Sequence, residues 1–128
     1  MHATLAFSSL PLFLGSALSD WAYAATYQVQ WTNFAGWLNA GGLVFGGVAL
    51  LWAAVDVLTA GPARHARAGL YLSLLFAAFV LGFVNALVHA KDGWAAMPAG
   101  LVLSIVVLLI AAIASGLGLA GVRRGVVA

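Results

Sequence analysis

Charged side chains are scarce in this chain. Five Lys and Arg residues and three Asp residues are present among 128 residues, so that 6% of the chain is charged. Soluble domains carry charge on roughly a quarter of their residues. Hydrophobic residues make up 65% of the chain, and its mean hydropathy is +1.10. Because a surface of this composition requires lipid rather than water as its solvent, we expect an integral membrane protein.

Cysteine is absent, which removes several classes of site. The chain can form no disulfide, thiolate metal site, iron–sulfur cluster or covalently attached c-type haem. It also lacks a glycine-rich phosphate loop with its lysine, a serine with a base at a recognisable spacing, and a basic face for nucleic acid. The sequence therefore favours a protein that is not an enzyme, although it does not decide the question. It predicts no resident metal or cofactor.

Apolar residues form four segments of membrane-spanning length. A helix needs about 20 apolar residues to cross about 30 Å of hydrocarbon, and four such helices with short connections take up nearly the whole chain. We therefore predict a single membrane domain, an all-α antiparallel four-helix bundle. The predicted helices cover residues 4–26, 34–60, 68–90 and 98–121. Residues 27–33 should connect the first two, and Pro98 should lie in the first turn of the last helix.

Basic residues predict the orientation of the bundle. Arg64 and Arg67 lie between the second and third predicted helices. Arg123 and Arg124 follow the fourth, whereas Lys91 is alone on the other side. Because cytoplasmic loops carry an excess of Lys and Arg, we expect both termini in the cytoplasm and a multi-pass protein of the bacterial inner membrane. An aromatic belt is expected at the opposite interface: Trp21, Tyr23, Tyr27, Trp31, Trp37 and Trp94.

Small residues recur at four-residue intervals along the predicted helices. In lipid, helices associate through close backbone approach and interhelical hydrogen bonds, which small residues permit. The predicted packing positions are Gly42, Gly46, Ala78, Gly82, Gly100, Ser104, Ala112 and Gly116. They predict a compact bundle. Because four helices cannot turn all these positions inward at once, some of them are also candidates for contact with another subunit.

Three polar residues are expected near one another at membrane depth. Asp20 lies about two turns inside the first predicted helix, and Asn85 and His89 lie four residues apart on one face of the third. Ionisable groups in hydrocarbon are costly and are candidates for function. We expect a polar clasp between the first and third helices, with a proton, quinone or other ligand site as the alternative.

A second polar group is predicted at the cytoplasmic edge. Asp56 lies about one turn inside the end of the second predicted helix, and Arg64 and Arg67 follow it closely. Long basic side chains extend toward the interface. The sequence therefore predicts an ion pair between Asp56 and one of these arginines.

The three histidines raise the possibility of a b-type haem. Axial ligation requires two imidazoles at one depth on facing helices. His2 and His65 are expected at the cytoplasmic edge and His89 at the other, and His2 lies in a terminus that we expect to fray. These residues are weak candidates for a haem carried by this chain alone, and a haem shared with a neighbouring subunit stays open.

Several motifs resemble the family called domain of unknown function 2231. They are LSDWAY at 18–23, QWTNF at 30–34, WL at 37–38, FVNALVH at 83–89, KD at 91–92 and PxGLxLS at 98–104. The resemblance spans nearly the whole chain and implies four transmembrane helices in an inner membrane. It also implies association with periplasmic oxidoreductases and cytochromes, and it brings no established catalytic residues. Members commonly carry a His-Pro segment at the first helix and a His near the start of the third, where this chain has His2 without a following Pro, and Tyr71.

Three functions are consistent with these observations. The first is a non-catalytic accessory or anchoring subunit that contacts lipid and the other membrane subunits of a respiratory or photosynthetic redox complex. The second is a b-haem- or quinone-binding anchor that passes electrons from a periplasmic dehydrogenase, or to a cytochrome. The third is a small proton-coupled exporter that uses Asp20.

Overall fold

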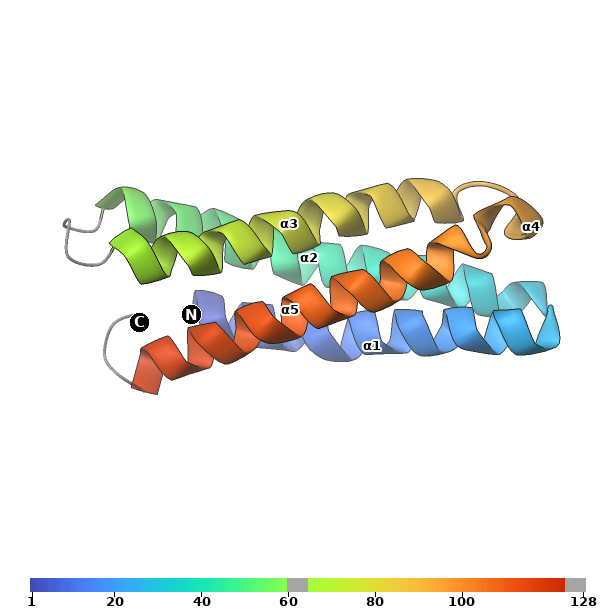
Figure 1. The fold of residues 1–128 in the computed structure, drawn as a ribbon, viewed down its shortest axis with the longest axis horizontal. Helices are drawn as coiled ribbons and strands as arrows, with labels where there is room; N and C mark the ends of the chain where they lie inside the picture. Colours follow the sequence, from blue (N-terminus) through green and yellow to red (C-terminus); the bar gives the residue numbers. More distant parts are fainter. Residues whose placement is uncertain (60–64, 124–128) are drawn as a thin grey trace.

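A computed structural model describes residues 1–59 and 65–123, with the side chains of all of these except 65–67. This part of the chain consists of helices with short connections and contains no strand. The helices are α1 (His2–Thr26), α2 (Val29–Thr59), α3 (His65–His89), α4 (Gly93–Ala96) and α5 (Ala99–Arg123). α1, α2, α3 and α5 run side by side along the long axis, and the single-turn α4 lies at one end (Figure 1).

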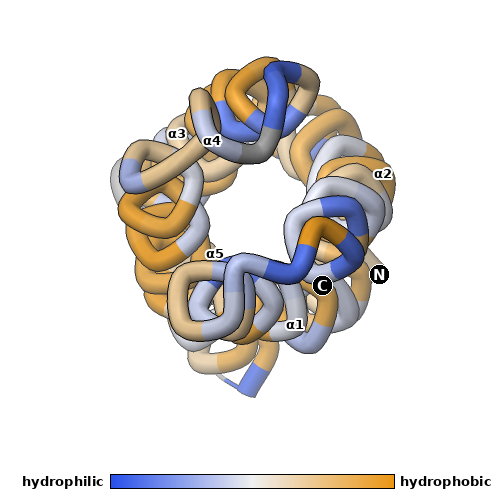
Figure 2. The backbone as a smooth tube through the Cα atoms, turned by 90° about the vertical axis from the view of Figure 1, so that its right-hand side faces the viewer, coloured by the Kyte–Doolittle hydropathy of each residue, from blue (hydrophilic) through white to orange (hydrophobic). Residues whose placement is uncertain are grey.

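The four long helices are arranged in a ring. α1 packs against α2 and α5, and α3 packs against the same two helices. α1 and α3 therefore occupy opposite corners when the bundle is viewed along its axis (Figure 2). The start of α1 and the end of α5 lie at the end of the bundle away from α4 (Figure 1). Any direct contact between α1 and α3 must consequently be made by side chains that cross the diagonal.

The structure has four long helices and the short α4, and several of the long helices begin or end at other residues than the sequence predicts. α2 begins at Val29 rather than at residue 34, and α3 begins at His65 rather than at residue 68. Residues 29–33 contain neither Pro nor Gly, so their polarity places them near the interface without breaking the helix. α1 ends because Tyr27 takes the left-handed conformation, with φ of 57°. Pro98 precedes α5, and its carbonyl accepts the first helical bond from Val102 N at 3.2 Å.

Small residues fill the inside of the bundle and large apolar residues cover the outside. Many core positions are alanines, including Ala35, Ala49 and Ala114, each 0% exposed. On the outer surface Leu58 is 84% exposed and Trp37 is 80% exposed. Because water would not favour this distribution, the outer surface is suited to lipid.

Three helices of the described chain are long and apolar enough to cross a membrane. They cover Val29–Thr59, Ala68–His89 and Ala99–Arg123. α1 is not among them, because it carries Ser9, Ser16, Ser19 and Asp20, all of them buried. The structure is thus that of an all-helical, multi-pass membrane protein.

Two of the predicted packing glycines lie against side chains of neighbouring helices, and two others have open space beside them. A Cβ atom on Gly42 would lie 2.5 Å from Cε1 of Phe13, and one on Gly82 would lie 2.9 Å from Cδ2 of Leu43. At Gly46 and Gly116 no described atom lies within 4 Å of the Cβ position. Gly46 borders a small internal hollow of about 10 Å³ that also touches Phe13. Gly116, like Ala112, is exposed on α5.

Candidate functional site

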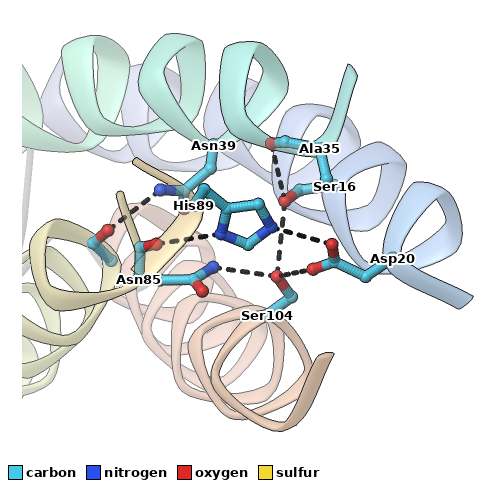
Figure 3. A network of polar contacts seen from close by, with 8 residues as sticks. Ser16, Asp20, Ala35, Asn39, Asn85, His89 and Ser104 are labelled. Carbon is cyan, nitrogen blue, oxygen red and sulfur yellow. Dashed lines mark hydrogen bonds and ion pairs between the residues drawn. The ribbon is translucent and has the colours of Figure 1, made fainter. Parts of the chain in front are cut away.

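Polar groups from all four long helices meet inside the bundle, near the end that carries α4. Asp20 comes from α1, Asn85 and His89 from α3, and Ser104 from α5, and a carbonyl of α2 joins them through Ser16 (Figure 3). We call this group the Asp20 site. It crosses the diagonal between α1 and α3, which share few backbone contacts.

Asp20 is the centre of the site and is 0% exposed. Its Oδ1 lies 2.8 Å from Nε2 of His89. Its Oδ2 accepts a hydrogen bond of 2.5 Å from the hydroxyl of Ser104. Because both oxygens have a partner, the carboxyl group avoids the full cost of desolvation in the bundle.

His89 is held in one orientation by its own helix and by a neighbouring glycine. Its Nδ1 lies 2.9 Å from the backbone carbonyl of Asn85. Since a carbonyl can only accept, Nδ1 must carry a hydrogen. A Cβ atom on Gly100 would lie 3.1 Å from Cε1 of the ring, so only a glycine leaves this space without displacing the ring.

Ser104 is the branching point of the network. It accepts a hydrogen bond of 2.8 Å from Nδ2 of Asn85 while donating to Asp20. Ser16 lies 3.4 Å from Ser104 and donates to the carbonyl of Ala35 at 3.0 Å. Asn39 lies one turn beyond Ala35 on α2 and donates to the carbonyl of Gly82 at 2.9 Å. The network therefore ties each long helix to its neighbours.

Hydrogen-bond geometry fixes the number of protons shared by Asp20 and His89. Nδ1 of His89 already carries one hydrogen, and the contact between Nε2 and Oδ1 requires one more between the two groups. That proton makes the pair a carboxylate with an imidazolium, or a carboxylic acid with a neutral imidazole. In both forms the pair has no net charge, which suits a membrane interior.

The sequence identified most of the Asp20 site but not its connections. Asp20, Asn85 and His89 lie together, although Asn85 reaches Asp20 only through Ser104. Ser104 had been expected only as a helix-packing residue. The participation of Ser16 and Asn39 was not predicted. The presence of serines and asparagines in apolar helices indicates that such a network exists. The spacing of these residues in the sequence does not show which of them contact one another.

An Asn85→Leu variant is expected to lower the free energy of unfolding by about 1 kcal/mol, the scale of an interhelical hydrogen bond in a membrane. The reason is the loss of the 2.8 Å bond from Asn85 to Ser104. Thermal stability in detergent measures the effect. Asn33→Leu is the matched control because Asn33 is exposed, and equal melting temperatures for the two variants would contradict the role of Asn85.

A second polar cluster lies at the opposite end of the bundle. His2 is 1% exposed, with Nδ1 at 3.1 Å from the hydroxyl of Tyr71 and Nε2 at 3.2 Å from Oδ2 of Asp56. The contact with Asp56 has the distance of an ion pair without the alignment of a hydrogen bond. The expectation of a frayed His2 is therefore wrong, because the buried Tyr71 and the half-exposed Asp56 hold its buried side chain. Of the arginines predicted to pair with Asp56, Arg64 and the side chain of Arg67 lie outside the described residues.

The described histidines do not form a haem site within one chain. His2 lies in the same helix as Asp20, 18 residues before it, which corresponds to about 27 Å of helix rise, and His89 contacts Asp20. The imidazoles of His2 and His89 therefore lie at opposite ends of the bundle, as the sequence predicts. The side chain of His65 is outside the described residues. Among the described residues no group of three or more His, Asp or Glu side chains is placed to hold a metal ion.

Comparison with protein families gives a match over residues 1–128 to the family described as predicted membrane protein DUF2231. The chain belongs to this family. The family assignment agrees with the resemblance seen in the motifs at 18–23 and 83–89, which contribute Asp20, Asn85 and His89 to the DUF2231 bundle described above. Comparison with curated proteins and with solved structures gives no match.

Proposed function

We propose that the chain is a non-catalytic integral subunit of a bacterial inner membrane that docks in lipid against a larger respiratory or photosynthetic redox complex. The observation that supports the proposal is that the larger of the hollows described below lie on the outer surface of the bundle. A hollow of about 390 Å³ lies on α5 and another of about 350 Å³ lies on α2, both open to the outside. Among the described residues, the hollow that Phe13 and Gly46 border inside the bundle has about 10 Å³, enough for a single water molecule at most.

The interior gives less support to a quinone anchor or an exporter. Both functions require a vacant space beside a polar group, whereas Asp20 and His89 are occupied by each other and by Ser104. A membrane-embedded bundle whose Asp20 site is closed by its own hydrogen bonds is suited to acting through its surface. The partners proposed are accordingly other membrane subunits, with a periplasmic dehydrogenase or cytochrome in the same complex.

The outer surface of α5 is the proposed contact with a partner helix. Ala112 and Gly116 are exposed, and no described atom lies within 4 Å of a Cβ position at Gly116. Gly116 also borders the hollow on α5, together with Leu119, Ala120 and Arg123. A helix of another subunit could approach the backbone of α5 closely here, which is how small residues promote association in lipid.

A Gly116→Leu variant is expected to fold normally and to lose at least tenfold in recovery of the complex. The added side chain projects into open space on this chain and into the path of a partner. The measurement is purification of tagged protein from native membranes in mild detergent, with mass spectrometry and an absorption spectrum on the same fraction. Gly69→Leu is the matched control, since Gly69 also has no described atom within 4 Å of its Cβ position.

Two results would contradict the proposal. Recovery of the same complex with Gly116→Leu and with wild type would remove the α5 contact. A Soret absorption band that remains on the isolated chain would instead support the haem-binding anchor. The native complex is needed in this experiment because its subunits identify the class of partner.

We further propose that α1 spans the membrane with the other three long helices and that both termini are cytoplasmic. The outward side of α1 is apolar at Phe7, Leu14, Leu18 and Trp21, which are all at least 46% exposed. Ser9, Ser16, Ser19 and Asp20 are buried and face the bundle instead. α1 can therefore cross lipid as a member of the bundle despite its lower hydropathy.

Single cysteines should report this topology directly, because the natural chain has none. Asp92→Cys, beyond α3, is expected to react with a membrane-impermeant maleimide added to spheroplasts. Thr59→Cys, at the exposed end of α2, should react only after the membrane is permeabilised. The reverse pattern would invert the orientation, and labelling of both from outside would show that the segment between them does not cross the membrane.

A further inference from the structure

One acceptor in the Asp20 site has no donor. Oδ1 of Asn85 is buried without a hydrogen-bond partner, although Nδ2 of the same side chain donates to Ser104. Buried amide oxygens are nearly always hydrogen-bonded, and leaving one unpaired is costly. An unpaired acceptor beside a carboxyl group is a place where the network can take up one more hydrogen.

Rotation of the Asn85 amide would reverse the direction of hydrogen bonding through Ser104. With Nδ2 facing Ser104, the hydroxyl must donate to Asp20, which accepts as a carboxylate oxygen. With Oδ1 facing Ser104, the hydroxyl donates to Asn85 instead. Oδ2 of Asp20 must then carry its own hydrogen and donate it to Ser104. Each orientation of Asn85 therefore matches one protonation state of Asp20.

We propose that the Asp20 site is a proton-binding site that holds one proton on Nε2 of His89, which donates it to Oδ1 of Asp20, and takes up a second on Oδ2 of Asp20. The second proton comes from water at the α4 end and forms an O–H bond on Oδ2. Ser104 turns its hydroxyl to Asn85, whose amide rotates by half a turn. His89 keeps both N–H groups, so that the site changes from no net charge to one positive charge.

The environment of the site contains few other groups that could take up this proton. α2 contributes the Ala35 carbonyl, which accepts from Ser16, and α5 contributes the hydroxyl of Ser104. Neither helix places a titratable side chain at the site among the described residues. On α1 the nearest titratable side chain is Tyr23, which is buried one turn from Asp20. Lys91 and Asp92 follow α3 and are exposed.

The composition of the chain makes the proposal measurable. All its acidic side chains are three aspartates, Asp20, Asp56 and Asp92. Infrared difference spectra of the full chain in lipid vesicles can therefore assign each protonated carboxyl band by substitution. A titration from about pH 8 to about pH 3 brackets the ordinary values of His and Asp.

Acidification is expected to produce a protonated carboxyl C=O band that is missing from Asp20→Asn and retained in Asp56→Asn and Asp92→Asn. Asn85→Leu should move the midpoint of this band to lower pH by about half a unit to one unit, because the Ser104 hydroxyl then loses its Asn85 acceptor in the state in which Asp20 donates to Ser104. In Ser104→Ala the same Asn85→Leu change should no longer move the midpoint, because Ser104 connects the two residues.

Three results would overturn the proposal. They are an Asp20 band present at every pH, an Asp20 band absent at every pH, and a midpoint that Asn85→Leu leaves unchanged. ¹⁵N-histidine resonances provide a separate measurement, because the chain has three histidines. His89 should remain doubly protonated across the transition, and a His89 that loses its Nε2 proton at neutral pH would also contradict the proposal. If Asn85→Leu does not fold, Ser104→Ala alone tests the same coupling, because it removes the hydroxyl that connects Asp20 to Asn85. A midpoint of the Asp20 band equal to that of wild type would then contradict the proposal.

Discussion

An Asp20→Ala variant is expected to lose about 3–5 kcal/mol of stability, the range measured when one partner of a buried charged pair is removed. Asp20 is 0% exposed and has a partner on each oxygen. Removing it leaves His89 without its acceptor and Ser104 without the group to which it donates. Because Asp20 and these two partners belong to three different helices, the loss should loosen the whole α4 end of the bundle. Equilibrium unfolding in mixed detergent micelles measures it.

The control and the test of mechanism use the same assay. Asp92→Ala removes an exposed aspartate whose side chain caps no helix, so its effect should stay within about 0.5 kcal/mol. The double variant Asp20→Ala with His89→Ala should cost less than the sum of the single variants, by about 0.5–3 kcal/mol for residues in contact. Simple additivity would show that Asp20 and His89 do not stabilise each other.

Gly42→Ala is expected to destabilise the bundle by about 1–3 kcal/mol, the usual cost of adding atoms to a filled core. The new Cβ would lie 2.5 Å from Cε1 of Phe13, whose ring is 3% exposed and has little room to move. α1 and α2 would have to separate or Phe13 would have to leave its position. Thermal and denaturant unfolding in detergent should agree on the size of the loss.

Gly46→Ala is the matched comparison because Gly46 lies one turn further along α2. Its Cβ would enter the small internal hollow, and alanine is the better helix former by up to about 1 kcal/mol, so this variant should be as stable as wild type or more stable. Replacing Phe13 by Leu should recover part of the loss in Gly42→Ala. Equal losses in Gly42→Ala and Gly46→Ala would show that helix propensity, and not contact with Phe13, controls the result.

The general architecture could be predicted because lipid imposes strong rules on sequence. The scarcity of charge predicts the membrane, and the lengths of the apolar segments predict four long helices at nearly the observed positions. The start of α2 was placed five residues late, because polar residues near an interface were interpreted as a connection. Only the backbone at Tyr27 shows where the first helix ends.

The sites were harder to predict than the helices because their contacts depend on rotation of each helix about its axis. Asp20, Asn85 and His89 stand out as polar residues at membrane depth. Ser104 does not, since a serine at a four-residue interval equally indicates close packing. The burial of His2 depends on Tyr71, 69 residues away, and nothing local in the sequence connects the two. Gly42 and Gly46 likewise look equivalent in sequence and differ only by what lies opposite.

The order in which a ribosome delivers the chain has a consequence for α1. His89 follows Asp20 by 69 residues and Ser104 follows it by 84 residues. At about 5–20 residues per second, the interval before Ser104 is made is roughly 4–17 s. Until His89 is made Asp20 has neither of its partners, and until Ser104 is made it lacks the second, so α1 lacks the bonds that later compensate its polar side. We therefore expect α1 to settle in the bilayer last among the long helices, although it is translated first.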